Sequence, residues 1–376
     1  MKNTVAKQTL TGMMLLVVAL FSLLPIANIY EGGWPENYET ETVSRLFSVD
    51  LLEGRINFLL FSIGVSGDYD RVIVGKDGWL FLGDQYGDGL SKGRGLTSVS
   101  EDDISRWINS MSSRQKWLTS KGIPMVFAIA PNKHSIYDEF LPEWASLQHP
   151  NSTDRLINSA SQLGFRIIDM RPGLIREKQN YDHLYNKTDT HWTMLGAYFG
   201  YRMVMRELAG LTGQLRYVRI AEFAADPSRG KSCCLANMLK LQDHLAEDYD
   251  SRYRVNFEGI RGSICLAARG QTGTDPGACE NVNNRRIDIP KGTIAEIVNE
   301  LALNDLAVLI IKDSFGLAHG RLFNNAFSHS WHLHYTTIKN ERAFKQLVEK
   351  LQPDAVIYQI VERDLYKKQF YQFAGK

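Results

Sequence analysis

The sequence of 376 residues predicts an α/β fold with a largely parallel β-sheet. Short, nearly all-apolar segments recur along the chain, as expected for strands that are buried on both faces of such a sheet. Segments with helical periodicity and helix-end signals alternate with these strands, which is typical of a parallel sheet covered by helices. The predicted strands are 124–131, 166–170, 307–312 and 354–361, and the predicted helices are 100–121, 152–163, 193–211 and 340–351.

The composition agrees with a globular protein and excludes several classes. Apolar residues make up 44% and charged residues 23%, which is typical of a packed domain and excludes a disordered, collagen-like or coiled-coil chain. The formal net charge of +1 argues against a nucleic-acid binder driven by bulk charge. Four cysteines are too few to build a disulfide scaffold.

One uncharged apolar segment, Thr9–Tyr30, is long enough to cross a membrane, because as a helix it would span about 33 Å. Lys2 and Lys7 precede it, so the positive-inside rule puts the N-terminus in the cytoplasm and the body outside. We expect an uncleaved anchor. A cleaved signal peptide is the alternative, although the nearest cleavage candidate, at Ala27, lacks a small residue two positions earlier. A buried helix of a soluble protein fits least, because the segment is apolar all round.

The elements of the body follow in order after this anchor, which we assign to residues 1–30. Residues 31–70 predict a linker with one packing helix, and residues 71–376 predict a single α/β domain. This domain opens with a β-hairpin over 72–82, since two apolar runs flank a Gly-rich turn. Residues 212–305 lack the strand–helix rhythm, so we expect an irregular insertion there.

All four cysteines lie in that insertion. Outside the cytoplasm disulfides are allowed, and adjacent cysteines rarely pair with each other, so Cys233 and Cys234 would each reach Cys265 or Cys279. One or two disulfides are therefore expected. Buried thiols remain an alternative, and so does a metal site, although no C-x-x-C spacing is present.

Ser314 directly follows the apolar strand 307–312 and precedes a segment of small residues. In open α/β sheets ligands bind beyond the carboxyl ends of the strands, where a serine on a strand-to-helix turn is exposed and flanked by backbone N–H groups. Ser314 is therefore a candidate nucleophile. The alternative is a helix N-cap, for which serine is a preferred residue.

Asp189 and His191 lie two residues apart in a loop just before the helix that begins at Thr193. A nucleophilic serine needs a base to take its proton, and the base needs an acceptor that orients its other nitrogen. These two side chains supply both. The alternatives are a capping aspartate with an exposed histidine, and His183 as a second candidate base.

Two further groups of polar residues are candidates for binding. Asn132 and Lys133 follow the strand 124–131, so they face the same rim as Ser314 and could contact a substrate or an oxyanion; a solvated turn is the alternative. Trp192 and Tyr335 could stack on a sugar, although core packing is the commoner role of such residues.

A histidine-rich stretch permits a metal site, but packing fits it better, because the stretch has no H-E-x-x-H motif. Its histidines are His319, His329, His332 and His334.

Several segments together resemble the periplasmic SGNH-hydrolase-like O-acetyltransferases of exopolysaccharide modification, the AlgJ/AlgX type known from alginate acetylation. The likeness covers roughly residues 70–376. It departs from the family at Lys312, where a glycine is common, and at Cys233-Cys234, where Gly-Asp is common and where this chain suggests a local disulfide. The matching segments are VIVGKDGWLFL at 72–82, APNKHSIYDEFLP at 130–142, DTHW at 189–192, GKSCCLANML at 230–239, IKDSFG at 311–316 and VERDLY at 361–366.

The resemblance implies an SGNH-like fold in which the D-x-H motif precedes the serine motif, a circularly permuted order that this sequence shows. It implies Ser314 as nucleophile, His191 as general base and Asp189 as its partner. It also implies a polysaccharide acceptor, a membrane-bound O-acyltransferase as the acetyl-supplying partner and an inner-membrane anchor with a periplasmic body. No nucleotide cofactor is implied, and no Gly-rich phosphate loop is present. An acetyl-esterase with the same triad and a non-catalytic polysaccharide-binding subunit are the alternatives.

Overall fold

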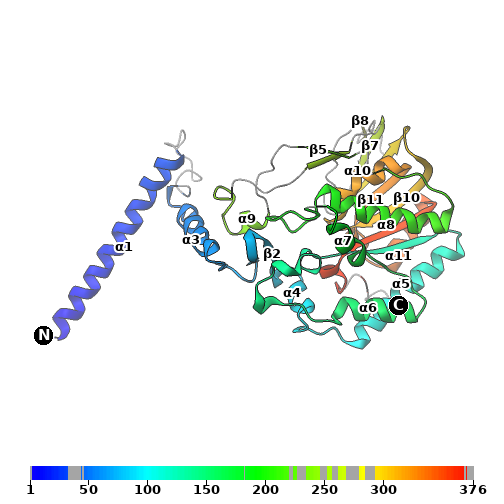
Figure 1. The fold of residues 1–376 in the computed structure, drawn as a ribbon. Helices are drawn as coiled ribbons and strands as arrows, with labels where there is room; N and C mark the ends of the chain where they lie inside the picture. The colour runs from blue at the N-terminus through cyan, green and yellow to red at the C-terminus, as the bar shows by residue number, and fades with distance from the viewer. Residues whose placement is uncertain are drawn as a thin grey trace.

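The computed structural model shows a sheet between two layers of helices, an α/β/α arrangement (Figure 1). The sheet has the strand order β4-β3-β12-β10-β11-β9-β7-β8 in the described part of the chain. The pairings from β4 to β11 are parallel and those from β11 to β8 are antiparallel. The structure describes residues 2–32, 44, 46–181, 183–219, 223–226, 234–245, 252–255, 261–267, 279–283, 293–367 and 370.

The parallel half of the sheet confirms the predicted fold class. Its central strands are apolar on both faces: alternate residues of β12 enter two different cores, with Ile357 in one and Val356 and Tyr358 in the other. Double burial explains why these strands appear in the sequence as continuous apolar runs. The strands of this half are β4 (Ile168–Asp169), β3 (Met125–Ala130), β12 (Ala355–Val361), β10 (Asn304–Lys312) and β11 (Phe327–His334).

Helices cover both faces of this sheet, and their predicted positions are confirmed within a few residues. The Ser100 side chain caps one of them by accepting a hydrogen bond from Asp103 N at 3.1 Å. One face carries α7 (Arg171–Lys178), α8 (Met194–Thr212) and α10 (Gly316–Ala326), and the other carries α5 (Glu101–Ser120), α6 (Ser152–Gln162) and α11 (Glu341–Leu351).

The expectation of an irregular insertion over 212–305 is wrong for part of that segment. It contributes β9 (Ile294–Asn299), β7 (Arg261–Ala267) and β8 (Cys279–Asn283), which extend the sheet with antiparallel pairings. These strands were missed because polar residues interrupt them; Glu296, for example, is buried within β9. Two further strands of the segment, β5 (Phe223–Asp226) and β6 (Arg252–Val255), pair with each other.

The predicted β-hairpin is confirmed as β1 (Val72–Val74) paired antiparallel with β2 (Leu80–Leu82). Its turn uses left-handed backbone at Asp77 and Gly78, with φ values of 54° and 77°. Leu80 N donates a hydrogen bond to Lys187 O at 3.0 Å, so the hairpin contacts the loop that carries Asp189 and His191. Two short helices lie nearby, α4 (Gly89–Gly93) and α9 (Leu235–Met238).

The described residues of the N-terminal part include α1 (Lys2–Gly32) and α3 (Asp50–Ser62), and Figure 1 shows α1 pointing away from the body. The packing helix predicted between 31 and 70 is confirmed as α3, whose buried Asn57 donates a hydrogen bond to Leu239 O at 2.9 Å. Among the helices that the structure describes, none combines the length and apolarity that crossing a membrane requires. The anchor at 1–30 stays a prediction.

Candidate active site

Ser314 lies in the turn between the end of β10 and the start of α10. The neighbouring Asp313 fixes this turn, because its carboxylate accepts hydrogen bonds from Phe315 N at 2.8 Å and from Val361 N at 2.5 Å. Burial, with the charge of Asp364, raises the pKa of Asp313 to about 6, although these N–H donors oppose the rise. The Ser314 side chain does not cap α10, whose first turn has Phe315 at its N-cap position.

The structure brings Ser314, His191 and Asp189 together in one chain of hydrogen bonds. His191 Nε2 lies 3.0 Å from Ser314 Oγ, and His191 Nδ1 lies 2.9 Å from Asp189 Oδ1. The same carboxylate oxygen accepts from His191 N at 3.2 Å, which fixes the spacing of the two residues. The carbonyl of His183, the second candidate base, accepts a hydrogen bond from Thr193 Oγ1 at 2.8 Å.

Asp189 is ionised at neutral pH. Burial alone would raise its pKa, but the hydrogen bonds and charge of His191, together with a hydrogen bond from the Cys234 side chain, lower it to about 2. A carboxylate on Nδ1 sets the tautomer of the imidazole, so that Nδ1 carries the proton and Nε2 is free to accept one from Ser314. This arrangement can activate a hydroxyl for attack on an acyl carbon.

Lys133 does not face a substrate, contrary to the prediction. It is only 3% exposed, and its ammonium donates to three carbonyl oxygens of the loop that carries Asp189 and His191. These belong to Asn186, Lys187 and Asp189 itself, at 2.9, 2.9 and 2.6 Å. Lys133 therefore holds this loop, which we call the base loop (residues 184–192), onto the end of β3.

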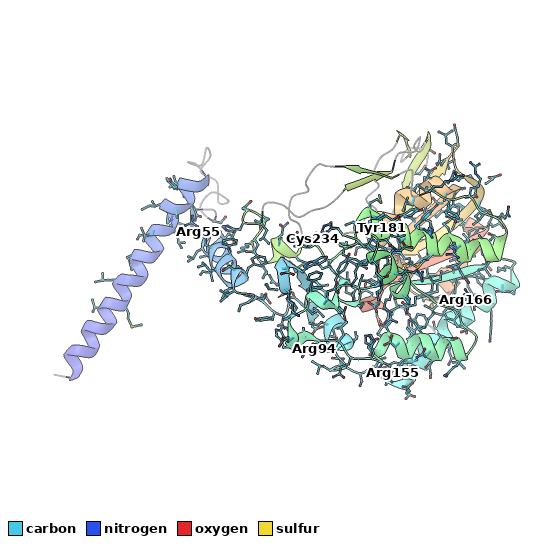
Figure 2. All side chains as sticks on the ribbon, viewed as in Figure 1. Arg55, Arg94, Arg155, Arg166, Tyr181 and Cys234 are labelled. Atoms are coloured by element: carbon cyan, nitrogen blue, oxygen red, sulfur yellow. The ribbon has the colours of Figure 1, made fainter. Side chains whose placement is uncertain are left out.

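Other distant segments also hold the base loop. The backbone N–H of Leu235, at the start of α9, donates to Thr188 O at 3.0 Å, next to Asp189. Cys234, labelled in Figure 2 beside α9, hydrogen-bonds the Asp189 carboxylate. On the other side, Tyr137 Oη accepts from Leu184 N at 3.0 Å. Sequence reasoning missed the role of Cys234, because nothing in its local sequence points to Asp189.

The sugar-stacking roles considered for Trp192 and Tyr335 do not fit the structure. Trp192 is 2% exposed, and its Nε1 donates to Phe315 O at 3.0 Å, so it links the base loop to the turn that carries Ser314. Tyr335 is 6% exposed and donates to Asp364 Oδ2 at 2.9 Å. Trp192 packs in one apolar core and Tyr335 in the other. Their ring faces are therefore covered by protein and are not open for stacking on a sugar.

Asn132 lies at the carboxyl end of β3, as predicted, and lines a pocket together with Arg363 and His134. Its side-chain oxygen accepts from Arg363 Nη1 at 3.1 Å, and the Arg363 guanidinium lies over the Phe315 ring. Its backbone N–H donates to Glu362 Oε2 at 2.6 Å. Asn132 is thus tied to the residues that follow β12, on the same rim as Ser314.

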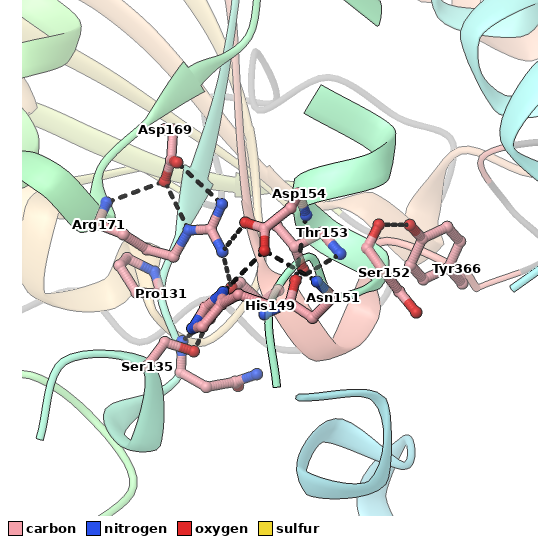
Figure 3. Close-up of polar contacts among 12 residues, drawn as sticks. Pro131, Ser135, His149, Asn151, Ser152, Thr153, Asp154, Asp169, Arg171 and Tyr366 are labelled. Carbon is pink, nitrogen blue, oxygen red and sulfur yellow. Dashed lines mark hydrogen bonds and ion pairs between the residues drawn. The ribbon is translucent and has the colours of Figure 1, made fainter. Parts of the chain in front are cut away.

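A largely buried network of ion pairs around Arg171 holds this rim in position (Figure 3). Arg171 binds Asp169 through two nitrogens, at 2.9 Å each, and Asp154 through a third, at 2.8 Å. Its Nη1 also lies 3.6 Å from Glu362 Oε1, and burial raises the pKa of Glu362 although Arg171 opposes the rise. The network joins the ends of β4 and β12 and the start of α6.

The histidine-rich stretch disperses among different partners. His319 contacts the Gln359 side chain, His329 lies 2.7 Å from Glu296, and His332 lies 3.0 Å from Ser330. Among the described residues no group of three or more His, Cys, Asp or Glu is arranged to hold a metal ion. His319 and His332 are buried, and His329 is half-buried against Glu296.

The cysteines follow the disulfide prediction in part. Cys265 is disulfide-bonded, and its register partner across the β7–β8 pair is Cys279. Cys234 carries a thiol, so the expectation that it would reach one of these two is wrong. The reason is its position at the start of α9, where its side chain contacts Asp189 instead. Cys233 lies outside the described residues.

Comparison with known proteins agrees with the predicted family. Residues 72–257 match the family described as "SGNH hydrolase-like domain, acetyltransferase AlgX". A "Probable alginate O-acetylase AlgJ" of Pseudomonas aeruginosa is 29% identical over 143 residues, which are 38% of this chain and 33% of that protein. The chain spans between a third and about half of the length of the curated relatives it matches.

Two solved structures confirm the SGNH-like α/β fold. PatB1 of Bacillus cereus, solved with a sulfonyl adduct, has a TM-score of 0.59 and 17% identity, with coverage of 80% of this chain and 96% of that chain. The O-acetyltransferase domain of AlgJ from Pseudomonas putida has a TM-score of 0.51 and 16% identity, with coverage of 79% and 93%. At these identities the likeness shows the fold alone. The family match includes the base loop but ends before β10, so Ser314 joins the site on its geometry.

Proposed function

We propose that this chain, whose residues 72–257 match the family of SGNH hydrolase-like AlgX acetyltransferase domains, is an O-acetyltransferase that acts on an exopolysaccharide. The observation that carries the proposal is the hydrogen-bonded series from Asp189 through His191 to Ser314. Relatives described as alginate O-acetylases support the same reaction class. A circularly permuted order of the motifs is part of this proposal, because Asp189 and His191 precede Ser314 in the chain.

In the proposed mechanism Ser314 Oγ attacks the carbonyl carbon of the acetyl donor while His191 Nε2 takes its proton. The ionised Asp189 stabilises the imidazolium that forms. Collapse of the tetrahedral intermediate releases the donor group, which takes the proton from His191, and leaves acetyl-Ser314. A sugar hydroxyl then attacks this ester as His191 takes the hydroxyl proton, and that proton returns to Ser314 when the acetylated sugar leaves.

The proposal extends to partners and location. The acceptor is a polysaccharide hydroxyl, Asn132 is the residue proposed to contact substrate, and a membrane-bound O-acyltransferase supplies the acetyl group. We place the body in the periplasm and the N-terminus in the inner membrane, on the uncharged segment Thr9–Tyr30 and the lysines before it. A tether of this kind would keep the enzyme close to a membrane acetyl donor.

Kinetics with an acceptor present test this function. The full chain in detergent is given a chromogenic acetyl ester and an oligosaccharide, beside Ser314→Ala and His191→Ala variants. We expect both variants to lose about 10³- to 10⁶-fold in kcat and the sugar to gain acetyl groups only with the parent. Ester cleavage without sugar acetylation would favour an acetyl-esterase with the same triad. Undiminished cleavage by Ser314→Ala would reject the mechanism.

A further inference from the structure

Lys312 is a buried lysine at the start of the turn that carries Ser314. It is the last residue of β10 and is 4% exposed. Its Cα partners on the neighbouring strands are Gln359 and His334. The strand residues that alternate with it, such as Ile310, enter the core that α8 and α10 cover. A lysine at this position is unexpected, since the rest of the strand end is apolar.

Gly316 of α10 makes room for this side chain, and Gly320 lies next to its end. Gly316 and Gly320 lie one helical turn apart, on the same face of the helix. A Cβ atom on Gly316 would lie 2.5 Å from Lys312 Cδ and 2.6 Å from Lys312 Cβ, so no larger residue fits there. A Cβ atom on Gly320 would lie 3.5 Å from Lys312 Nζ. The lysine side chain therefore fills the space that the missing Cβ of Gly316 leaves open.

The ammonium ends on the backbone of the nucleophile turn, which we define as residues 312–317. Lys312 Nζ donates to Gly316 O at 3.0 Å. Within the same turn Gly316 N donates to Asp313 O and Leu317 N donates to Ser314 O, both at 3.1 Å. Lys312 thus holds the peptide two residues beyond Ser314, while Asp313 holds the peptide next to it.

Burial of this charge has a cost in stability. Burial lowers the pKa of Lys312 to about 7, with Asp313 opposing the decrease in part. The nearby His319 and His332 are also fully buried, and burial holds the pKa of each below its ordinary value, so they add no second positive charge beside Lys312. A methionine of similar volume would fill the space without that cost. The amino group of Lys312, which can donate to Gly316 O in either protonation state, is therefore explained by that hydrogen bond rather than by packing.

We infer that Lys312 is a positioning residue, which holds the first turn of α10 so that Ser314 Oγ stays within reach of His191 Nε2. The inference rests on the proposed function. It assigns Lys312 no contact with substrate and no part in proton transfer. Because the contact is to backbone, its loss would let the serine turn shift while the fold remains, and small displacements at a reacting atom cost large factors in rate.

Lys312→Met in the full-length protein tests the inference, because methionine keeps the stem and removes the ammonium. We expect kcat for a chromogenic acetyl ester to fall about 10- to 100-fold, KM to change less than about twofold, and the melting temperature to stay level or rise. Lys121→Met, at an exposed lysine that pairs with Glu349, is the matched control and should leave all three unchanged.

A double-mutant cycle gives the second measurement. Gly316→Ala should lower kcat at least about tenfold in the parent, since its Cβ meets Lys312, but should have little further effect in a Lys312→Gly background. Additive losses of kcat in the cycle would overturn the inference. So would a Lys312→Met variant that retains kcat, or one that loses both kcat and stability.

Ser314→Ala, assayed in parallel, separates the two proposals. An inactive parent would overturn both, whereas an active parent with an inactive Ser314→Ala leaves the triad standing whatever Lys312 does.

Discussion

The base loop and the nucleophile turn carry the two halves of the same site, and they differ in the contacts that hold them in place. The base loop is held by segments far away in the sequence, with contacts from Lys133, Leu80 and Leu235. In the nucleophile turn, Asp313 and Lys312 bond to backbone within four positions, and Val361 N and Trp192 Nε1 add contacts from distant segments. Substitutions far from Asp189 should therefore disturb the base, whereas the serine should also respond strongly to changes in its own turn.

The same comparison extends to charge. Lys133 and Lys312 are both buried lysines that donate to backbone carbonyls. In the described part of the chain Lys133 donates to three carbonyl oxygens, whereas Lys312 donates to that of Gly316. A buried cation with more acceptors recovers more of its desolvation cost. We therefore expect Lys133 to stabilise the fold and Lys312 to destabilise it, although both support catalysis.

The largest effect should come from the base loop itself. Asp189→Asn removes the charge that stabilises the imidazolium and changes the tautomer of His191, so kcat should fall about 10³- to 10⁴-fold with KM nearly unchanged. Steady-state kinetics with an acetyl ester measure this change. The exposed Asp138→Asn is the control. A loss of less than tenfold would mean that Asp189 does not act on His191.

Lys133→Met should disturb the base loop from a distance. Three partly buried carbonyls lose their donor, so the free energy of unfolding should fall by about 2–4 kcal/mol and kcat by about 10- to 100-fold. Urea denaturation and kinetics on one preparation measure both. The comparison predicts opposite stability changes for Lys133→Met and Lys312→Met. A Lys133→Met variant as stable as the parent would contradict this predicted difference between the two lysines.

Stability should also depend on pH through Lys312. Its pKa is about 7 in the folded protein against an ordinary value of 10.5, so between these values the unfolded chain binds a proton that the folded chain does not. The free energy of unfolding then rises with pH, by about 2 kcal/mol from pH 7 to 9, relative to Lys312→Met. Denaturation of both proteins at several pH values measures this difference. Parallel curves would show that Lys312 does not titrate in this range.

The smallest effect should come from the link between the two halves. Trp192→Phe keeps most of the packing but removes the hydrogen bond to Phe315 O, at a cost of about 1 kcal/mol in stability and a few-fold in kcat. Thermal melting and kinetics measure it, with Trp117→Phe on α5, a tryptophan distant in sequence from both halves, as the control. A loss in kcat as large as that of Asp189→Asn would show that the base loop and the nucleophile turn depend on this hydrogen bond to keep their positions.

The contrast between the halves also explains what the sequence could predict. The nucleophile turn is local: an apolar strand, Asp313-Ser314 and a glycine-containing helix start can be recognised along the chain, and so Ser314 was found. The supports of the base loop are long-range, so the role of Lys133 was mistaken for substrate binding and that of Cys234 was missed. The outer strands β7 to β9 were missed because polar residues interrupt their pattern.

The central claim is that Ser314 carries the acetyl group, and direct detection of that ester tests it. The full-length protein is mixed with an activated acetyl ester, quenched in acid within seconds and digested for peptide mass analysis. The account predicts a gain of about 42 Da, one acetyl group in place of hydrogen, on the peptide that contains Ser314, and no gain there in Ser314→Ala. Acetyl found on another residue, or turnover without any acetyl-Ser314 and undiminished in Ser314→Ala, would contradict it.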